Sequence, residues 1–253
     1  MSNPIQSCRK AVTDYSLQTS IVRMKLINLI IVVSGLTMHV YASAQMTKQQ
    51  RSIGLIAALT ARGDWNALKP ELSKALGNGL TIHEIKEELV HLYAYVGFPK
   101  SISGLQVFLT VLEERKSQGL SDEWGRAASP IDQTLSKYER GKQVLEDLTQ
   151  HPLSETKPGY QQFSPEIDTF LKEHLFADLF ERDVLTYQQR ELATVSALIA
   201  LGNVEPMLRS HLNICLIQGY TKVQLEELIA SLKPHLSRKA IKSAKEILDE
   251  LRE

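Results

Sequence analysis

Cysteine is nearly absent from this chain of 253 residues, which contains only Cys8 and Cys215. Two cysteines so far apart in the sequence exclude a metal site of the CxxC type. We expect no structural disulfide either, because Cys8 precedes a segment that we predict is removed. Excess charge is also absent: 29 Lys and Arg balance 29 Asp and Glu, so no basic stripe favours nucleic-acid binding.

Aromatic residues make up only 6% of the chain, and β-branched runs are scarce beyond the N-terminal region. Leu, Ala, Glu, Lys and Gln dominate instead, and these residues favour helices. The apolar fraction of 43% and the charged fraction of 23% are ordinary for a globular protein. We therefore predict an all-α protein, long enough for one large domain or two small ones.

The longest apolar run, LINLIIVVSGLTMHV at residues 26–40, has the flanks of a secretory signal peptide. Arg23 and Lys25 precede it, and the small residues Ala42 and Ala44 follow it as an A-x-A cleavage site. A membrane span needs ~20 apolar residues, and this run is shorter. An uncleaved N-terminal anchor is the alternative.

We predict that residues 1–44 are a signal peptide cleaved between Ala44 and Gln45, with Met24 as a second candidate for the true start. The cleaved protein would be exported, either periplasmic or secreted, and would not stay inserted in the membrane. No cysteine follows the apolar run directly, so a lipid anchor is not indicated.

Two stretches about 140 residues apart resemble each other, QQRSIGLIAALTARGDW in the first half and QQRELATVSALIALGNVEP in the second. Internal repeats usually mean duplicated units. We predict a first module at residues 46–115, a linker at 116–135 and a second module at 136–253. The matched positions are Arg51 and Arg190, Gly63 and Gly202, Gly79 and Gly219, and Thr81 and Thr221.

Each module is predicted to contain three helices. In the first copy the first helix runs from Arg51 to Arg62, and Gly63 stops it. The second helix begins near Pro70 in one copy and near Pro206 in the other, since proline is tolerated in a first helical turn. The third opens with a capping box. Its residues are Thr81 with Glu84, and Thr221 with Gln224. Further helices are predicted over residues 132–150, 165–180 and 238–253.

These sequences resemble the carboxymuconolactone decarboxylase family, a branch of the alkylhydroperoxidase D-like superfamily. The second half carries FSPEIDTFLKEHLFADLFERDVLTYQQREL and then HLNICLIQGYTKVQLEELI, in the family's order. The first half matches through GLTIHEIKEELVHLYAYVGFPKS, with its Y-x-G-F-P ending. The resemblance covers residues 48–110 and 136–235. It implies two such helical modules in tandem and a homo-oligomer, either a trimer or a hexamer.

The family implies two different chemistries. One branch decarboxylates a lactone with acid–base residues and no cofactor, and the other reduces peroxides with a C-x-x-C pair before a His. The positions seven and four before His211 are Val204 and Met207, so this sequence lacks the thiol pair. We interpret the lone Cys215 as a small buried hydrophobe.

The resemblance implies a catalytic role for His211, which matches the family's active-site His. From its spacing alone, His211 fits a core histidine. Glu173 lies in EHLFAD, which matches an E-x-x-x-G-D pattern with Ala177 in place of the glycine. Arg190 can hold a substrate carboxylate, and Glu173 can orient His211 or exchange a proton with it. The alternative is a structural Glu–Arg pair between two helices.

His91 and Tyr95 lie four residues apart, on one face of the third helix of the first copy. The second copy lacks both residues, and the first copy has Glu71 where the second has His211. We therefore predict one composite site per chain or a site shared between subunits. In that site His91 and Tyr95 bind the substrate, and Glu173, Arg190 and His211 are catalytic.

The predicted function is cofactor-free acid–base chemistry on a small lactone or carboxylic acid, by a lyase related to 4-carboxymuconolactone decarboxylase. No metal site is predicted, because His83-Glu84 is not completed to an HExxH motif. One alternative is a peroxide-defence protein of the same superfamily that has lost its thiol pair. The other is a non-catalytic helical scaffold in the cell envelope.

Overall fold

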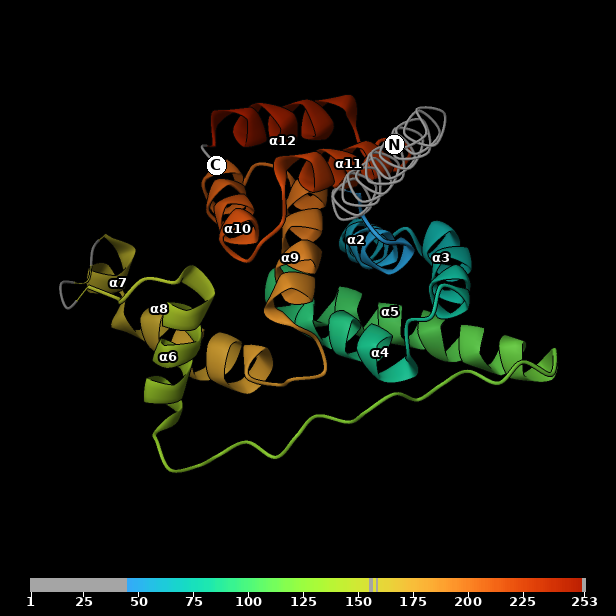
Figure 1. Cartoon of the computed structure of the whole chain (residues 1–253), viewed down its shortest axis with the longest axis horizontal. Coiled ribbons are helices and arrows are strands. Elements are labelled where there is room, and N and C mark those ends of the chain that lie inside the picture. The colour runs from blue at the N-terminus through green and yellow to red at the C-terminus, as the bar shows by residue number, and fades with distance from the viewer. Residues whose placement is uncertain (1–44, 155–156, 158, 252–253) are drawn as a thin grey trace, which may run out of the picture. The chain divides into compact units, whose positions relative to one another are not determined.

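The computed structural model describes residues 45–154, 157 and 159–251, so the predicted signal peptide at residues 1–44 lies outside the described part. Met46–Glu253 forms one compact unit of the chain. In the part described, this unit contains helices and no strand (Figure 1). The prediction of an all-α fold is confirmed. None of the described helices combines the length and the apolar character that a membrane crossing requires.

The first helix of each predicted module is 15 residues long: α2 (Lys48–Arg62) in the first half and α9 (Tyr187–Leu201) in the second. A capping box opens both helices. Thr47 and Gln50 form it in α2, and Thr186 and Gln189 form it in α9. The helix predicted from Arg51 therefore begins three residues earlier, because Thr47 already satisfies a free N–H of the first turn.

The second helices, α3 (Trp65–Gly77) and α10 (Glu205–Ile217), have 13 residues each. Pro206 stands in the first turn of α10, as predicted. The prediction for Pro70 is wrong, because this residue lies inside α3. The helix starts earlier since Asp64 caps it and accepts a hydrogen bond from the Ala67 N–H at 3.2 Å.

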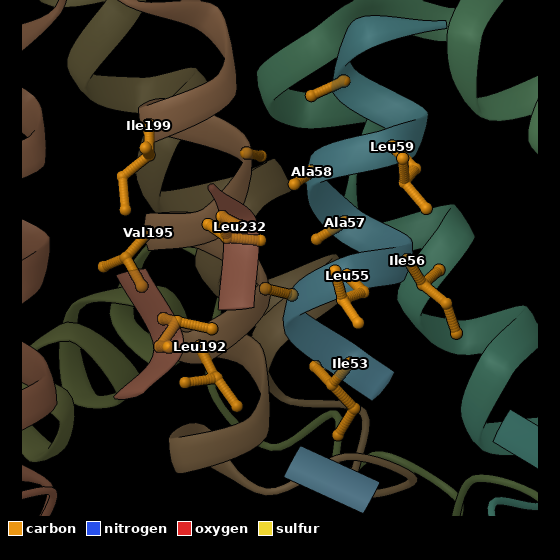
Figure 2. Packing of buried hydrophobic residues seen from close by; sticks show 14 of the residues in the cluster. Ile53, Leu55, Ile56, Ala57, Ala58, Leu59, Leu192, Val195, Ile199 and Leu232 are labelled. Carbon is orange, nitrogen blue, oxygen red and sulfur yellow. The ribbon is translucent and has the colours of Figure 1, made fainter. Parts of the chain in front are cut away.

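The third helices, α4 (Ile82–His91) and α11 (Lys222–Leu232), begin at the predicted capping boxes. The same three helices thus follow one another in both halves. At the centre α2 lies beside α9, and small side chains such as Ala57 and Ala58 allow a close approach (Figures 1 and 2). Helix α4 also contacts α9, and α11 contacts α2. This crossed packing brings residues of the two halves together.

The remaining helices surround this centre. Helix α5 (Tyr93–Ser117) follows α4 and is kinked at Gly97, whose φ of 80° suits glycine. The charged C-terminal helix α12 (Arg238–Glu250) packs on α10 and α11. Between the halves lie α6 (Lys137–Thr149), α7 (Tyr160–Phe163) and α8 (Pro165–Phe170).

The helix predicted over 165–180 is found, but its second part is wound differently. Leu171–Phe180 forms a π-helix, η1, which ends with a hydrogen bond from Glu181 N–H to the Phe176 carbonyl at 3.1 Å. It packs against α6 around a second small core. Gly141 permits this approach, because a Cβ there would lie 1.8 Å from the Lys172 carbonyl oxygen.

One acidic residue is buried among the apolar side chains of the main core. The Glu88 side chain on α4 is buried, and neither carboxylate oxygen has a hydrogen-bond partner of acceptable geometry. Burial raises the pKa of this carboxyl well above its ordinary value; the backbone of Ala57 opposes the shift, and the nearby Glu71 carboxylate adds to it. The repeat aligns Glu88 with Leu228 of α11, a residue that is also fully buried.

We expect Glu88→Leu to stabilise the protein by about 1–3 kcal/mol at neutral pH, because it removes an unpaired buried polar group. With its pKa raised in the fold, Glu88 destabilises the protein increasingly as pH rises above 4.5. The variant should lose that dependence in urea unfolding. Replacement of the exposed Glu226 by Leu is the control and should stay within about 0.5 kcal/mol. Equal pH dependence in wild type and Glu88→Leu would contradict the interpretation.

Candidate functional site

A buried ion cluster lies where α4 of the first half meets α9 of the second. The side chains of Glu87 and Arg190 are 1% and 0% exposed, and Arg190 Nη2 donates to Glu87 Oε1 at 2.8 Å. From the turn before α9, Arg182 donates to the same carboxylate through Nε, at 2.9 Å, and through Nη2, at 3.0 Å. Burial alone would raise the pKa of Glu87, but the two guanidinium groups outweigh burial and lower it.

His91, one turn after Glu87, is held as a neutral imidazole. Its Nε2 lies 3.0 Å from Thr194 Oγ, and that hydroxyl donates its own proton to the Arg190 carbonyl. The network therefore assigns the proton of His91 to Nε2 and leaves Nδ1 as an acceptor, 3.5 Å from Arg190 Nη1. Burial and the charge of Arg190 lower the pKa of His91 well below its ordinary value.

A second histidine, His211, has a pKa that is shifted in the opposite direction. His211 on α10 bonds through Nδ1 to Glu191 Oε2 at 2.7 Å, with the Glu191 side chain 0% and the His211 side chain 17% exposed. Burial lowers the pKa of His211, but the charge and hydrogen bond of Glu191 outweigh it, so the pKa is raised. Two histidines whose surroundings shift their pKa values apart are suited to acid–base roles.

Tyr95 stands between the two histidines. Its ring centroid lies 5.3 Å from that of His91 and 6.0 Å from that of His211. The Tyr95 hydroxyl is buried and close to Thr194, but no hydrogen bond of acceptable geometry completes it. Arg190 Nε and Glu191 Oε1 are likewise buried and unpaired. Unpaired buried polar atoms are rare in proteins, and three of them lie in this one cluster.

The structure brings four of the five predicted site residues into one cluster: His91, Tyr95, Arg190 and His211. The fifth, Glu173, lies half-buried on η1. Among the described residues no hydrogen bond or ion pair joins Glu173 to the cluster. Helix spacing cannot show which carboxylate faces His211, and it is Glu191 that does so.

Glu87, Arg182, Glu191 and Thr194 were not predicted from the sequence. The repeat contains a signal for Glu191, because it aligns with Ser52 while His211 aligns with Glu71. In the first half, Ser52 Oγ donates to Glu71 Oε1 at 2.9 Å, so the same two positions are bonded in both halves.

The crossed ion pair is repeated as well. Glu87 aligns with Glu227, and Glu227 lies 3.6 Å from Arg51, the counterpart of Arg190. This second pair is 47% exposed at Arg51 and 29% at Glu227, whereas the first is buried. The two halves thus contain corresponding ion pairs of unequal burial, and the buried pair is the one that lies beside His91.

Comparison with known proteins finds a family match in the half that contains His211. Residues 165–250, from the start of α8 to the end of α12, match the carboxymuconolactone decarboxylase family. The family segment contains Arg182, Arg190, Glu191 and His211. The resemblance predicted from the sequence is confirmed for this segment.

Two known proteins are similar to part of the chain. The 4-carboxymuconolactone decarboxylase of Acinetobacter baylyi is 28% identical over 116 residues, which are 46% of this chain and 86% of that protein. An uncharacterized protein of Methanocaldococcus jannaschii is 27% identical over 79 residues, 31% of this chain and 74% of that protein.

Thiol chemistry is poorly supported at this site. In the described ranges the one cysteine is Cys215, which is buried one turn after His211. Burial raises the pKa of its thiol well above the ordinary value, and the Glu191 carboxylate raises it further. A thiol held in this way is a poor nucleophile. No group of three or more His, Cys, Asp or Glu side chains within the described residues is arranged to hold a metal ion.

Proposed function

We propose that this protein is an enzyme that performs acid–base chemistry on a small lactone or carboxylic acid without a cofactor. The observation that carries the proposal is the Glu191–His211 pair at 2.7 Å beside the unpaired Tyr95 hydroxyl. The family of residues 165–250, and the name of the Acinetobacter relative, support a decarboxylase-like reaction.

In the proposed reaction the substrate loses CO₂ and His211 supplies a proton. The bond between the carboxylate and the ring carbon breaks, and its electron pair stays on the substrate as an enolate conjugated with the lactone carbonyl. His211, held as an imidazolium by Glu191, then transfers its Nε2 proton to the carbon. The Tyr95 hydroxyl donates a hydrogen bond to the enolate oxygen, and the nearby Arg190 charge stabilises it.

A composite site follows from this assignment, since Glu87, His91 and Tyr95 come from the first half and Arg190, Glu191 and His211 from the second. We propose that the halves are two copies of one module whose sites have diverged. The oligomeric state, export and the cleavage of residues 1–44 remain predictions from the sequence.

The buried charges favour an enzyme over a scaffold. An Arg–Glu pair removed from water is often no more stabilising than apolar residues of the same size. A scaffold gains nothing from such a pair, whereas an acid–base site needs fixed charges around its proton donor. The superfamily's peroxide chemistry is the second candidate, and the buried state of Cys215 speaks against it.

The proposal is tested by measuring CO₂ release from a panel of lactone carboxylic acids that includes 4-carboxymuconolactone. We expect turnover by the full chain, and a loss of kcat/KM of about 10²–10⁴-fold in His211→Asn. His235→Asn is the matched control, because His235 is the half-buried counterpart of Tyr95 and lies outside the cluster. No turnover of any lactone acid, or full activity of His211→Asn, would contradict the proposal.

A further inference from the structure

A groove lies where the end of α11 meets α12, two helices that pack on each other. Its volume of about 460 Å³ falls within the range of about 300–1,000 Å³ that is common for small-molecule sites. None of the residues that line it belongs to the buried ion cluster, and the proposed reaction uses none of them. The groove is therefore a second place on the molecule where a ligand can be held.

The floor of the groove is apolar. Leu236 and Ile241 line it, and both also pack against the main core. The alkyl stems of the lysines around the groove extend this apolar surface. Inorganic anions and nucleic acids bind mainly through charge and need no apolar floor. The floor therefore favours a ligand with a hydrocarbon part.

The rim of the groove is cationic. Three cations follow one face of α12, at spacings of four and three residues: Arg238, Lys242 and Lys245. Lys233, at the end of α11, is the fourth. The lining contains one carboxylate, Glu246, which lies 3.5 Å from Lys242. Within the described part of the chain, no carboxylate lies at ion-pair distance from Lys233, Arg238 or Lys245.

This excess of positive charge is local, because 29 Lys and Arg balance 29 Asp and Glu in the whole chain. Lysine and arginine side chains in contact with water are charged at neutral pH, so the excess does not depend on the protonation of any histidine. The predicted signal peptide does not suit the groove, since residues 1–44 contain four Lys and Arg and one Asp. An anionic ligand is the one that complements the rim.

We propose that this groove binds the anion of a medium-chain fatty acid. The tail lies on the floor formed by Leu236 and Ile241, and the carboxylate lies among the cations of α12. The guanidinium of Arg238 can hold a carboxylate through two parallel hydrogen bonds. Binding at this groove is independent of the reaction proposed above.

The length of the groove limits the length of the tail. Arg238 and Lys245 are seven residues apart, which is ~10 Å along α12. An extended chain of about eight to ten carbons has a similar length, given C–C bonds of ~1.5 Å. An exposed ion pair contributes little by itself. We therefore expect the tail to supply most of the affinity and the cations to select the charge of the head group.

Calorimetry on the full chain with decanoate, hexanoate and decyltrimethylammonium tests the assignment, each ligand being kept below its critical micelle concentration. We expect decanoate to bind about tenfold more tightly than decyltrimethylammonium, which has the same tail and the opposite charge. Hexanoate should bind at least tenfold more weakly than decanoate, because four CH₂ groups are missing. Added salt should weaken the preference for the anion and leave the dependence on tail length.

Reversing the charge of the rim should reverse the preference. Arg238→Glu/Lys245→Glu leaves two cations and three carboxylates in the lining, so decyltrimethylammonium should bind more tightly than decanoate. Both positions are exposed, and an acidic residue suits the first turn of α12. The matched control, Lys48→Glu/Lys239→Glu, makes the same change in net charge at two exposed positions outside the groove and should retain the preference for decanoate.

Thermal unfolding shows whether the variants retain the fold. If Arg238→Glu/Lys245→Glu is less stable than wild type, Arg238→Gln/Lys245→Gln gives the same test and should reduce the preference for decanoate. All variants retain residues 26–40, so binding of the ligands to that apolar run cancels in the comparison. Equal affinity for the two decyl ions, or an unchanged preference in both groove variants, would overturn the assignment. Binding to phosphatidylglycerol vesicles without binding of monomeric decanoate would also overturn it.

Discussion

Replacing Glu87 with Ala is expected to lower the free energy of unfolding by about 3–5 kcal/mol, because it leaves the fully buried Arg190 without its counter-ion. The loss does not measure what the ion pair contributes, since much of it is the cost of an unpaired charge away from water. Arg182 would lose the same partner, but its side chain is 38% exposed and water can solvate it.

The chain contains its own control for this experiment. Glu227→Ala removes the counterpart of Glu87, which lies 3.6 Å from the partly exposed Arg51. A partly exposed pair contributes about 0–1 kcal/mol, and Glu227 also accepts a hydrogen bond from the Met46 N–H at 3.0 Å, so this variant should lose no more than about 2 kcal/mol. The midpoints of urea unfolding, compared at a constant m-value, give the change in the free energy of unfolding for each variant. Equal losses in the two variants would mean that burial of the first pair does not matter.

The pH dependence of Glu87→Ala adds a second test. Because the fold lowers the pKa of Glu87, its contribution is present above 4.5 and disappears as pH falls through the lowered value. Wild type should therefore lose stability on acidification over a range in which Glu87→Ala does not. If the free energy of unfolding of the two proteins changed with pH in parallel, the lowered pKa assigned to Glu87 would be contradicted.

Replacing Glu191 with Gln is expected to lower kcat/KM on a lactone acid by about 10²-fold or more. The two side chains have nearly the same shape, so the packing should change little. The amide can still bond to His211 Nδ1, but the negative charge that holds the imidazolium is lost. Burial then lowers the pKa of His211 without opposition. The form that donates the proton disappears at a lower pH.

A pH–rate profile distinguishes this effect from simple damage. In wild type the activity that needs protonated His211 should persist to a pH above 6.5, and in Glu191→Gln it should fall off below 6.5. The stability that the pair contributes is fully present below pH 6.5 and is lost as pH rises through the raised pKa. The variant should lack that contribution as well. An activity loss with an unchanged pH profile would show that Glu191 acts only through packing.

Features that depend on residues close together in the sequence could be predicted from it. The start of α4 at Thr81 and of α11 at Thr221 follows from a capping box within four residues, and both were correct. The start of α3 was missed because two signals compete there, and the Asp64 cap prevailed over Pro70.

The candidate site was predicted less completely, because its contacts join distant residues. Arg190 and Glu87 are 103 positions apart, and no spacing along the chain reveals that α4 crosses to α9. Glu173 was chosen for His211 from a pattern within one helix, whereas the partner, Glu191, lies on another helix that packs against α10. Aligning the two halves position by position does find Glu191, because Ser52 and Glu71 are bonded in the first half.

The titration of the two histidines by NMR is the most direct test of a composite acid–base site, with His91→Asn and His211→Asn variants to assign the imidazole signals. We predict that His211 remains protonated to a pH above 6.5 and that His91 stays neutral well below it. Ordinary titration of both imidazoles near pH 6.5, or the reverse order, would contradict the account.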